Sequence, residues 1–177
     1  MAIDAAALKV LIERELERVS DDRIVAFIRR LLVEPDPVPR DWDYGEPGQQ
    51  FVCWTVLDDS AGSDTGIAYC DQGFGPRCPW GLVSISKGRG APGGSIGMDS
   101  GWLPTFLDAF FESMAATELP HWRVFQRAPD GSLSALTGEI GWTAAWEQCK
   151  ALSAENPTGR YDVDCDLAIE VRHHAYG

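Results

Sequence analysis

The sequence predicts an α+β fold, in which an N-terminal αα-hairpin precedes a mostly antiparallel sheet of about six strands with two further helices on one face. Apolar residues recur at helical spacing in four segments and follow strand patterns in six others. Short, turn-rich links join most of the expected strands, which favours antiparallel neighbours. The length of 177 residues favours one domain over residues 1–177.

Residues 1–33 are expected to form a helical hairpin. Leu8, Ile12 and Leu16 lie at helical spacing, with charged residues between them. A second apolar stripe over residues 24–32 follows the candidate N-cap residues 20–22. Residues 34–49 contain four prolines and predict a Pro-rich loop, because proline lacks an amide donor and disfavours helix in the residue before it.

Residues 50–177 are expected to form the α+β body. The expected strands are 51–57, 67–70, 81–86, 122–127, 133–136 and 161–172. The expected helices are 102–116 and 143–154. A turn at residues 129–132 joins two of these strands, because proline and glycine favour its dihedral angles. The last strand alternates apolar and polar residues, which predicts one buried and one exposed face.

The charge of the chain restricts its partners. It carries 27 acidic and 15 basic side chains, for a formal charge of −12. Residues 41–177 hold 19 of the acidic groups and 8 of the basic ones. Such a balance argues against nucleic acid and against an anionic membrane surface, and it attracts cationic partners. We therefore expect the partner to be another protein with a basic surface.

The cysteines indicate the compartment. No run of apolar residues is long enough to span a membrane, and the first residues lack the pattern of an export signal. An odd number of cysteines, five, then favours free thiols in a reducing environment. We expect a cytoplasmic protein.

No motif for catalysis or cofactor binding is complete. Residues 88–93 match G-x-G-x-x-G, but the next expected helix begins about nine residues later, so no helix N-terminus meets a pyrophosphate there. The spacing of cysteine, histidine and aspartate fits neither zinc nor calcium. The sequence therefore predicts no cofactor and no metal ion, and it makes residues 88–101 a long glycine-rich loop.

Two acidic segments are candidates for binding a partner. In the first, aromatic and acidic residues alternate, which combines anchors with electrostatic steering. Its members are Asp41, Trp42, Asp43, Tyr44 and Glu46. The second is an acidic stripe on one face of the last strand. Its members are Asp162, Asp164, Asp166 and Glu170. The alternative is structural: the tryptophan packs against the core, and the carboxylates keep an edge strand from pairing with other chains.

Together with the overall acidity and the seven tryptophans, these two segments resemble bacterial immunity proteins of polymorphic-toxin and contact-dependent-inhibition systems. The resemblance implies a protein that blocks a toxin, often a basic nuclease, by covering its active surface. Two other functions stay open. One is a small enzyme of unknown reaction in which residues 88–101 act as a flap over a pocket. The other is a structural or regulatory subunit that oligomerises through its N-terminal helices.

Overall fold

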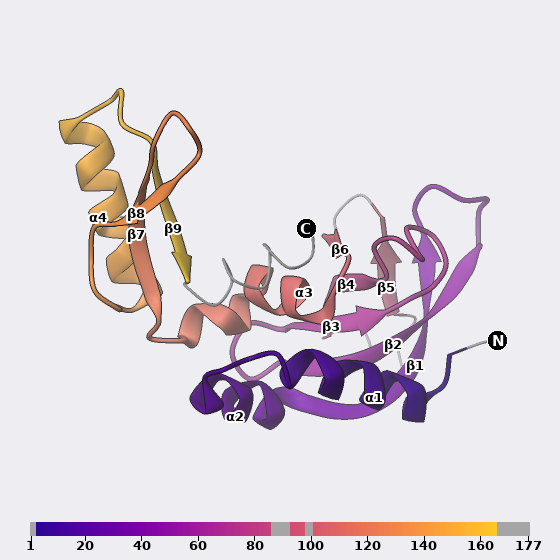
Figure 1. Ribbon diagram of the computed structural model, residues 1–177. Helices are drawn as coiled ribbons and strands as arrows, with labels where there is room; N and C mark the ends of the chain where they lie inside the picture. Colours follow the sequence, from indigo (N-terminus) through magenta and orange to yellow (C-terminus); the bar gives the residue numbers. More distant parts are fainter. Residues whose placement is uncertain (1–2, 86–92, 98–100, 166–177) are drawn as a thin grey trace. The chain divides into compact units, whose positions relative to one another are not determined.

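The computed structural model describes residues 3–85, 93–97 and 101–165 (Figure 1). The α+β class is confirmed, because these residues form four α-helices and two sheets. Contacts divide the chain into two compact units, residues 1–115 and 116–177. The single domain over residues 1–177 stays a prediction, since contacts do not test whether each unit folds alone. Within the described ranges, no helix is both long and apolar enough to cross a membrane.

A curled, mixed sheet of six strands forms the centre of the first unit, in the order β5-β1-β2-β3-β4-β6 (Figure 1). The strands are β1 (Leu32–Trp42), β2 (Gln50–Asp59), β3 (Thr65–Tyr69), β4 (Trp80–Ser84), β5 (Gly93–Ile96) and β6 (Trp102–Leu103). Four of its pairings are antiparallel, as expected, but β5 pairs with β1 in parallel. The expectation of one mostly antiparallel sheet is therefore correct only in part.

The Pro-rich loop expected over residues 34–49 is wrong for most of its length, because residues 32–42 form β1. Pro35, Pro37 and Pro39 occupy alternate positions, so their missing N–H groups all fall on one edge of the strand. The other edge keeps its donors and pairs with β2. The same alternation continues beyond the prolines: the N–H of Trp42 donates to Gln49 on the β2 side at 2.9 Å. Prolines at every second residue are thus compatible with a strand that needs N–H donors on only one of its edges.

Both N-terminal helices form, as α1 (Ala5–Leu16) and α2 (Asp22–Leu31). Each begins at an aspartate N-cap, and an ion pair of 2.7 Å between Glu13 and Arg29 links them. Their buried apolar residues pack toward the sheet, with α1 against β1 and α2 against β2. The predicted αα-hairpin is therefore correct in its two helices, whereas their apolar faces contact the sheet.

The helix expected over residues 102–116 is shorter, as α3 (Phe106–Glu112), and residues 114–118 form the 3₁₀-helix η1 (Met114–Glu118). Thr105 sets its start, because its hydroxyl accepts the N–H of Asp108 at 3.0 Å and donates to the carboxylate of that residue at 2.7 Å. Glu15 of α1 adds a second cap. Its carboxylate oxygens accept the N–H groups of Phe106 at 3.1 Å and Leu107 at 2.9 Å. Burial is the main influence on Glu15 and raises its pKa.

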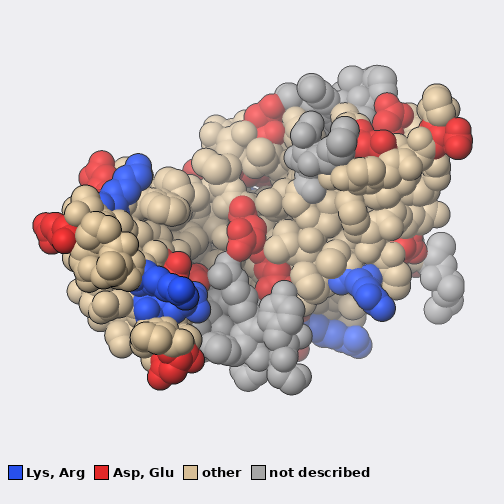
Figure 2. Space-filling view, turned by 90° about the horizontal axis from the view of Figure 1, so that it is seen from above, with Lys and Arg blue, Asp and Glu red and all other residues tan. Residues whose placement is uncertain are grey.

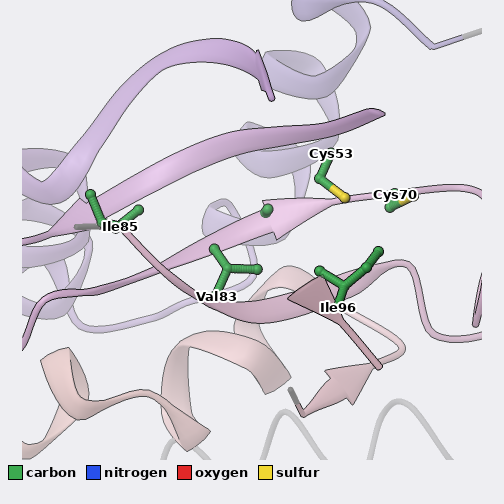
Figure 3. Packing of buried hydrophobic residues seen from close by; sticks show 6 residues of the cluster. Cys53, Cys70, Val83, Ile85 and Ile96 are labelled. Carbon is green, nitrogen blue, oxygen red and sulfur yellow. The ribbon is translucent and has the colours of Figure 1, made fainter. Parts of the chain in front are cut away.

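The two faces of the curled sheet have different cores. Helix α3 covers the outer face, where the ring centroid of Phe106 lies 5.4 Å from that of Trp80 of β4. The inner face holds a compact apolar cluster. Its residues come from β2, β3, β4 and β5 and from the positions directly after β3 and β4, and their side chains point toward one another (Figure 3). Its members are Cys53, Ala68, Cys70, Val83, Ile85 and Ile96. Gly93 to Ile96 come from the expected loop 88–101, so that expectation is wrong for these residues because they pair with β1.

The second unit is a three-stranded antiparallel sheet with one helix packed on it (Figure 1). The elements are β7 (Trp122–Arg127), β8 (Leu133–Ala135), α4 (Trp142–Glu155) and β9 (Tyr161–Cys165). The predicted turn at residues 129–132 is confirmed, and Gly131 adopts the required positive φ of 88°. Because these three strands form a separate sheet, the expectation that α3 and α4 cover one face of one sheet is wrong.

The aromatic face of α3 gives a prediction about stability. Phe110 has no exposed surface and contacts the rings of Phe27 and Phe111 at 6.3 and 5.3 Å. We expect Phe110→Ala to lower the free energy of unfolding by about 3–5 kcal/mol, measured by urea denaturation. Val10→Ala, on the exposed side of α1, is the control and should change it little. An unchanged denaturation midpoint in Phe110→Ala would contradict this packing.

The Glu15 cap gives a second prediction. Glu15→Ala leaves two backbone donors at the start of α3 without their acceptor, so the free energy of unfolding should fall by about 1–3 kcal/mol. Glu17→Ala, which removes an exposed carboxylate from the same helix, should have a much smaller effect. Equal effects of the two substitutions in urea denaturation would show that the cap does not stabilise the unit.

Candidate functional site

The first predicted segment forms part of a cluster of five aromatic rings at one end of the curled sheet. Trp42 is its centre, with ring centroids 5.3 Å from Tyr44, 5.5 Å from Phe51 and 5.1 Å from Phe74. Trp102 of β6 joins it through Phe74 at 5.9 Å. The side chain of Tyr44 is 59% exposed and that of Phe74 is 38% exposed. The cluster, called the aromatic cluster below, therefore has a half-buried base, formed by Trp42, Phe51 and Trp102, and an exposed surface.

Backbone contacts hold the cluster in place. Trp42 ends β1, and its carbonyl accepts the N–H of Gly45 at 3.1 Å in the turn that leads to β2. Asp43 donates its N–H to Ile96 of β5 at 3.1 Å. Gly73 has a φ of 65°, and a Cβ atom there would lie 2.9 Å from the Trp42 ring. A glycine at position 73 therefore lets the loop that carries Phe74 approach the indole closely.

The segments that carry the exposed rings are rich in carboxylates. Residues 41–76 contain seven carboxylates and no lysine or arginine. Four of the seven, Asp41, Asp43, Glu46 and Asp71, lie within three residues of a ring of the cluster, whereas the other three lie at the end of β2 or beyond it. Asp41 and Glu46 are exposed, and Asp43 is half-buried. Asp41 accepts a hydrogen bond at 2.8 Å from the side chain of Gln50, the first residue of β2. This bond fixes the orientation of the Asp41 carboxylate. The exposed rings thus lie in a region of negative potential.

The second predicted segment has a different environment. Asp162 pairs with Arg127 of β7 through two contacts of 2.9 Å, and Asp164 lies opposite Arg123 in the register of β7 and β9. Tyr161, Asp162, Val163 and Asp164 are all half-buried, so the expected division into a buried and an exposed face is wrong for these residues. Neighbouring arginines offset much of this charge. Asp166 and Glu170 lie outside the described residues.

The surface view agrees with this distribution. Figure 2 shows Asp and Glu side chains in several separate groups on the face in view, with Lys and Arg groups among them. The structure thus joins Asp41, Trp42, Asp43, Tyr44 and Glu46 into one surface and places Asp162 and Asp164 in the second unit. It adds three rings that the sequence reasoning missed, Phe51, Phe74 and Trp102. The absence of basic residues from 41 to 76 is the sequence signal that could have marked the region.

The two other candidate functions, the enzyme with a flap and the oligomerising subunit, stay predictions. The flap of the enzyme alternative, residues 88–101, lies partly outside the described residues, and its residues 93–96 are a strand. Within the described ranges, no group of three histidine, cysteine or carboxylate side chains could hold a metal ion. For oligomerisation, Leu8, Ile12 and Ile28 of α1 and α2 are buried within their own unit, whereas Val10 of α1 is exposed.

Two of the cysteines form a buried pair. Cys53 directly precedes Trp54 of β2 and Cys70 directly follows its partner Tyr69 of β3, so the antiparallel register places the two cysteines opposite each other (Figure 3). A hydrogen bond to the sulfur of Cys70, together with burial, raises the pKa of Cys53, which stays a neutral thiol. All five cysteines are free in the structure. Cys53 is therefore a buried neutral thiol, which packs as a small apolar side chain and is a poor nucleophile.

The thiols give a third prediction. Protein made in the cytosol and unfolded without reductant should react with a thiol reagent at five sites. The same count after treatment with reductant is the control. A count of three would mean that two cysteines, with Cys53 and Cys70 the first to test by mass spectrometry, are joined in the native protein.

No family model, curated protein or solved structure matches this chain. Function is therefore inferred below from the aromatic cluster and its charge.

Proposed function

We propose that this protein binds another protein with a basic surface through the aromatic cluster, and that it acts as an immunity protein by covering the active surface of a toxin. The observation that carries the proposal is the exposure of Tyr44 and Phe74 within a stretch of chain with seven carboxylates and no basic residue. Tyrosine and tryptophan are frequent anchors of protein interfaces, and surrounding charge selects the partner.

The geometry separates two roles within this surface. Tyr44 and Phe74 present apolar ring surface whose burial slows dissociation, and the Trp42 ring beneath them keeps both in place. Asp41, Asp43 and Glu46 act at longer range by attracting a cationic partner before contact. Occlusion needs no chemistry from this chain, which agrees with an interface built from rings and carboxylates.

The aromatic role gives the fourth prediction. The probe is the product of the gene immediately upstream, because an immunity gene follows the gene of its toxin. Tyr44→Ala should raise the dissociation rate of this complex about thirtyfold, since loss of an interface anchor costs at least about 2 kcal/mol. Trp42→Ala should raise it further. Trp146→Ala, an equally large exposed residue of α4, is the control and should leave the rate unchanged.

The charge role is measured in the same binding experiment. Neutralising Asp41, Asp43 and Glu46 to their amides should lower the association rate chiefly, with a smaller effect at high salt, because screening acts over about 8 Å at 0.15 M ionic strength. Asp162→Asn together with Asp164→Asn tests the second segment. If the association rate changed neither with salt nor in any of these variants, the aromatic cluster would be rejected as the binding surface. An upstream product that neither binds nor is inhibited would reject the toxin-blocking role.

A further inference from the structure

A buried arginine inside the curled sheet has no acidic partner among the residues that the structure describes. Arg40 of β1 is 1% exposed, and its Nη1 donates to the carbonyl of Ser84 at 3.2 Å. Its Nε has no hydrogen-bond partner, and no carboxylate among the described residues forms an ion pair with it. Burial lowers the pKa of Arg40, yet a guanidinium stays charged in proteins. A buried charge of this kind is costly unless an anion pairs with it.

A cavity of about 320 Å³ lies against this side chain. Val38, Arg40, Thr55 and Ile85 line its inner part, and all four are buried. They lie on the inner face of the curled sheet, and the cavity extends from Arg40, two residues before Trp42, toward Val33 at the other end of β1. Ligand sites of about 300–1,000 Å³ are common in the mouths of curled and closed sheets, where an apolar wall surrounds a few polar groups. The volume and lining of this cavity are typical of such a site.

The mouth of the cavity has the opposite charge. Asp36 and Asp58 line it, with Asp36 four residues before Arg40 on the same strand. At about 3.4 Å per residue, the two backbone positions are roughly 13 Å apart. Glu34 also lines the mouth and is paired with Lys9 of α1, and Asp58 accepts the backbone N–H of Ser60 at 2.8 Å. A ligand that enters therefore meets carboxylates first and a guanidinium at the end.

We infer that this cavity binds a small ω-amino carboxylate, with its carboxylate on Arg40, its apolar chain along Val38 and Ile85, and its ammonium group near Asp36 and Asp58. The carboxylate supplies the acceptor that Nε lacks, and its second oxygen fits the fork of donors on a guanidinium. The acidic mouth repels dianions such as phosphate esters and favours a ligand that carries its own positive charge. Arg40 pairs with Phe51 in the register of β1 and β2, but none of the five rings of the aromatic cluster lines the cavity.

Three probes of equal chain length test the inference by titration calorimetry with the whole protein. They are 6-aminohexanoate, which carries both charges, hexanoate, which lacks the amine, and hexylamine, which lacks the carboxylate. We expect 6-aminohexanoate to bind most tightly, hexanoate more weakly, and hexylamine not measurably. Binding of 6-aminohexanoate should also raise the thermal unfolding temperature.

Arg40→Met removes the charge and keeps an apolar chain of similar length, a change that buried sites often tolerate. It should weaken 6-aminohexanoate binding about ten- to a hundredfold, as loss of a charged hydrogen-bond partner does. Arg14→Met, on the exposed face of α1, is the matched control. If Arg40→Met does not fold, Asp36→Asn with Asp58→Asn tests the same site from its mouth, and it should reduce 6-aminohexanoate affinity to that of hexanoate.

The outcomes are distinct from those of the proposed function. Tyr44→Ala should leave probe binding unchanged, because Tyr44 does not line the cavity. Equal affinities for hexylamine and 6-aminohexanoate would overturn the role of Arg40. Equal affinities for hexanoate and 6-aminohexanoate would overturn the role of the acidic mouth. No binding of any probe in the millimolar range would overturn the inference as a whole.

Discussion

The placement of hydrogen-bond donors along β1 is the constraint on which the first unit depends. Proline at positions 35, 37 and 39 removes donors from one edge only, so β1 pairs along its length with β2 while its other edge pairs with β5 only from Arg40 onward. This parallel pairing, which begins at Arg40, places β5 beside the C-terminal end of β1. Because side chains alternate along a strand, the same register turns Arg40 inward and brings Trp42 to the end of the inner face.

The curl leaves an inner face that is narrower than the outer one, and the residue sizes follow from this difference. Small side chains, Cys53, Ala68 and Cys70, fill the centre of the inner face. Large rings cover the outer face, where α3 packs. Trp42 and Phe51 fill the inner face at the aromatic end, and the cavity begins beside Arg40, the register partner of Phe51, and extends toward Val33. Both proposed sites are therefore neighbouring parts of one layer of side chains.

Local patterns predicted the elements well and their partners poorly. The helical stripes of α1, α2 and α4 and the strand from Trp122 to Arg127 depend on periodicity within the element, which the sequence displays directly. A high number of prolines predicts a loop, so the prediction missed β1. The prolines of β1 are spaced two residues apart, and this spacing is the feature that permits a strand. Whether six strands form one sheet or two depends on long-range pairing, which periodicity does not contain. The same limit hid Phe74, which reaches Trp42 only through the fold.

Charge links the two proposals, because it favours the same kind of partner at both sites. The excess of carboxylates, which gives the chain its formal charge of −12, raises the local concentration of cations and lowers that of simple anions. At the aromatic cluster this favours a basic protein surface. At the cavity it means that an anion reaches Arg40 only if it also carries a positive group, which the acidic mouth can stabilise. A buried cation behind an acidic surface thus selects for opposite charges at the two ends of one small ligand.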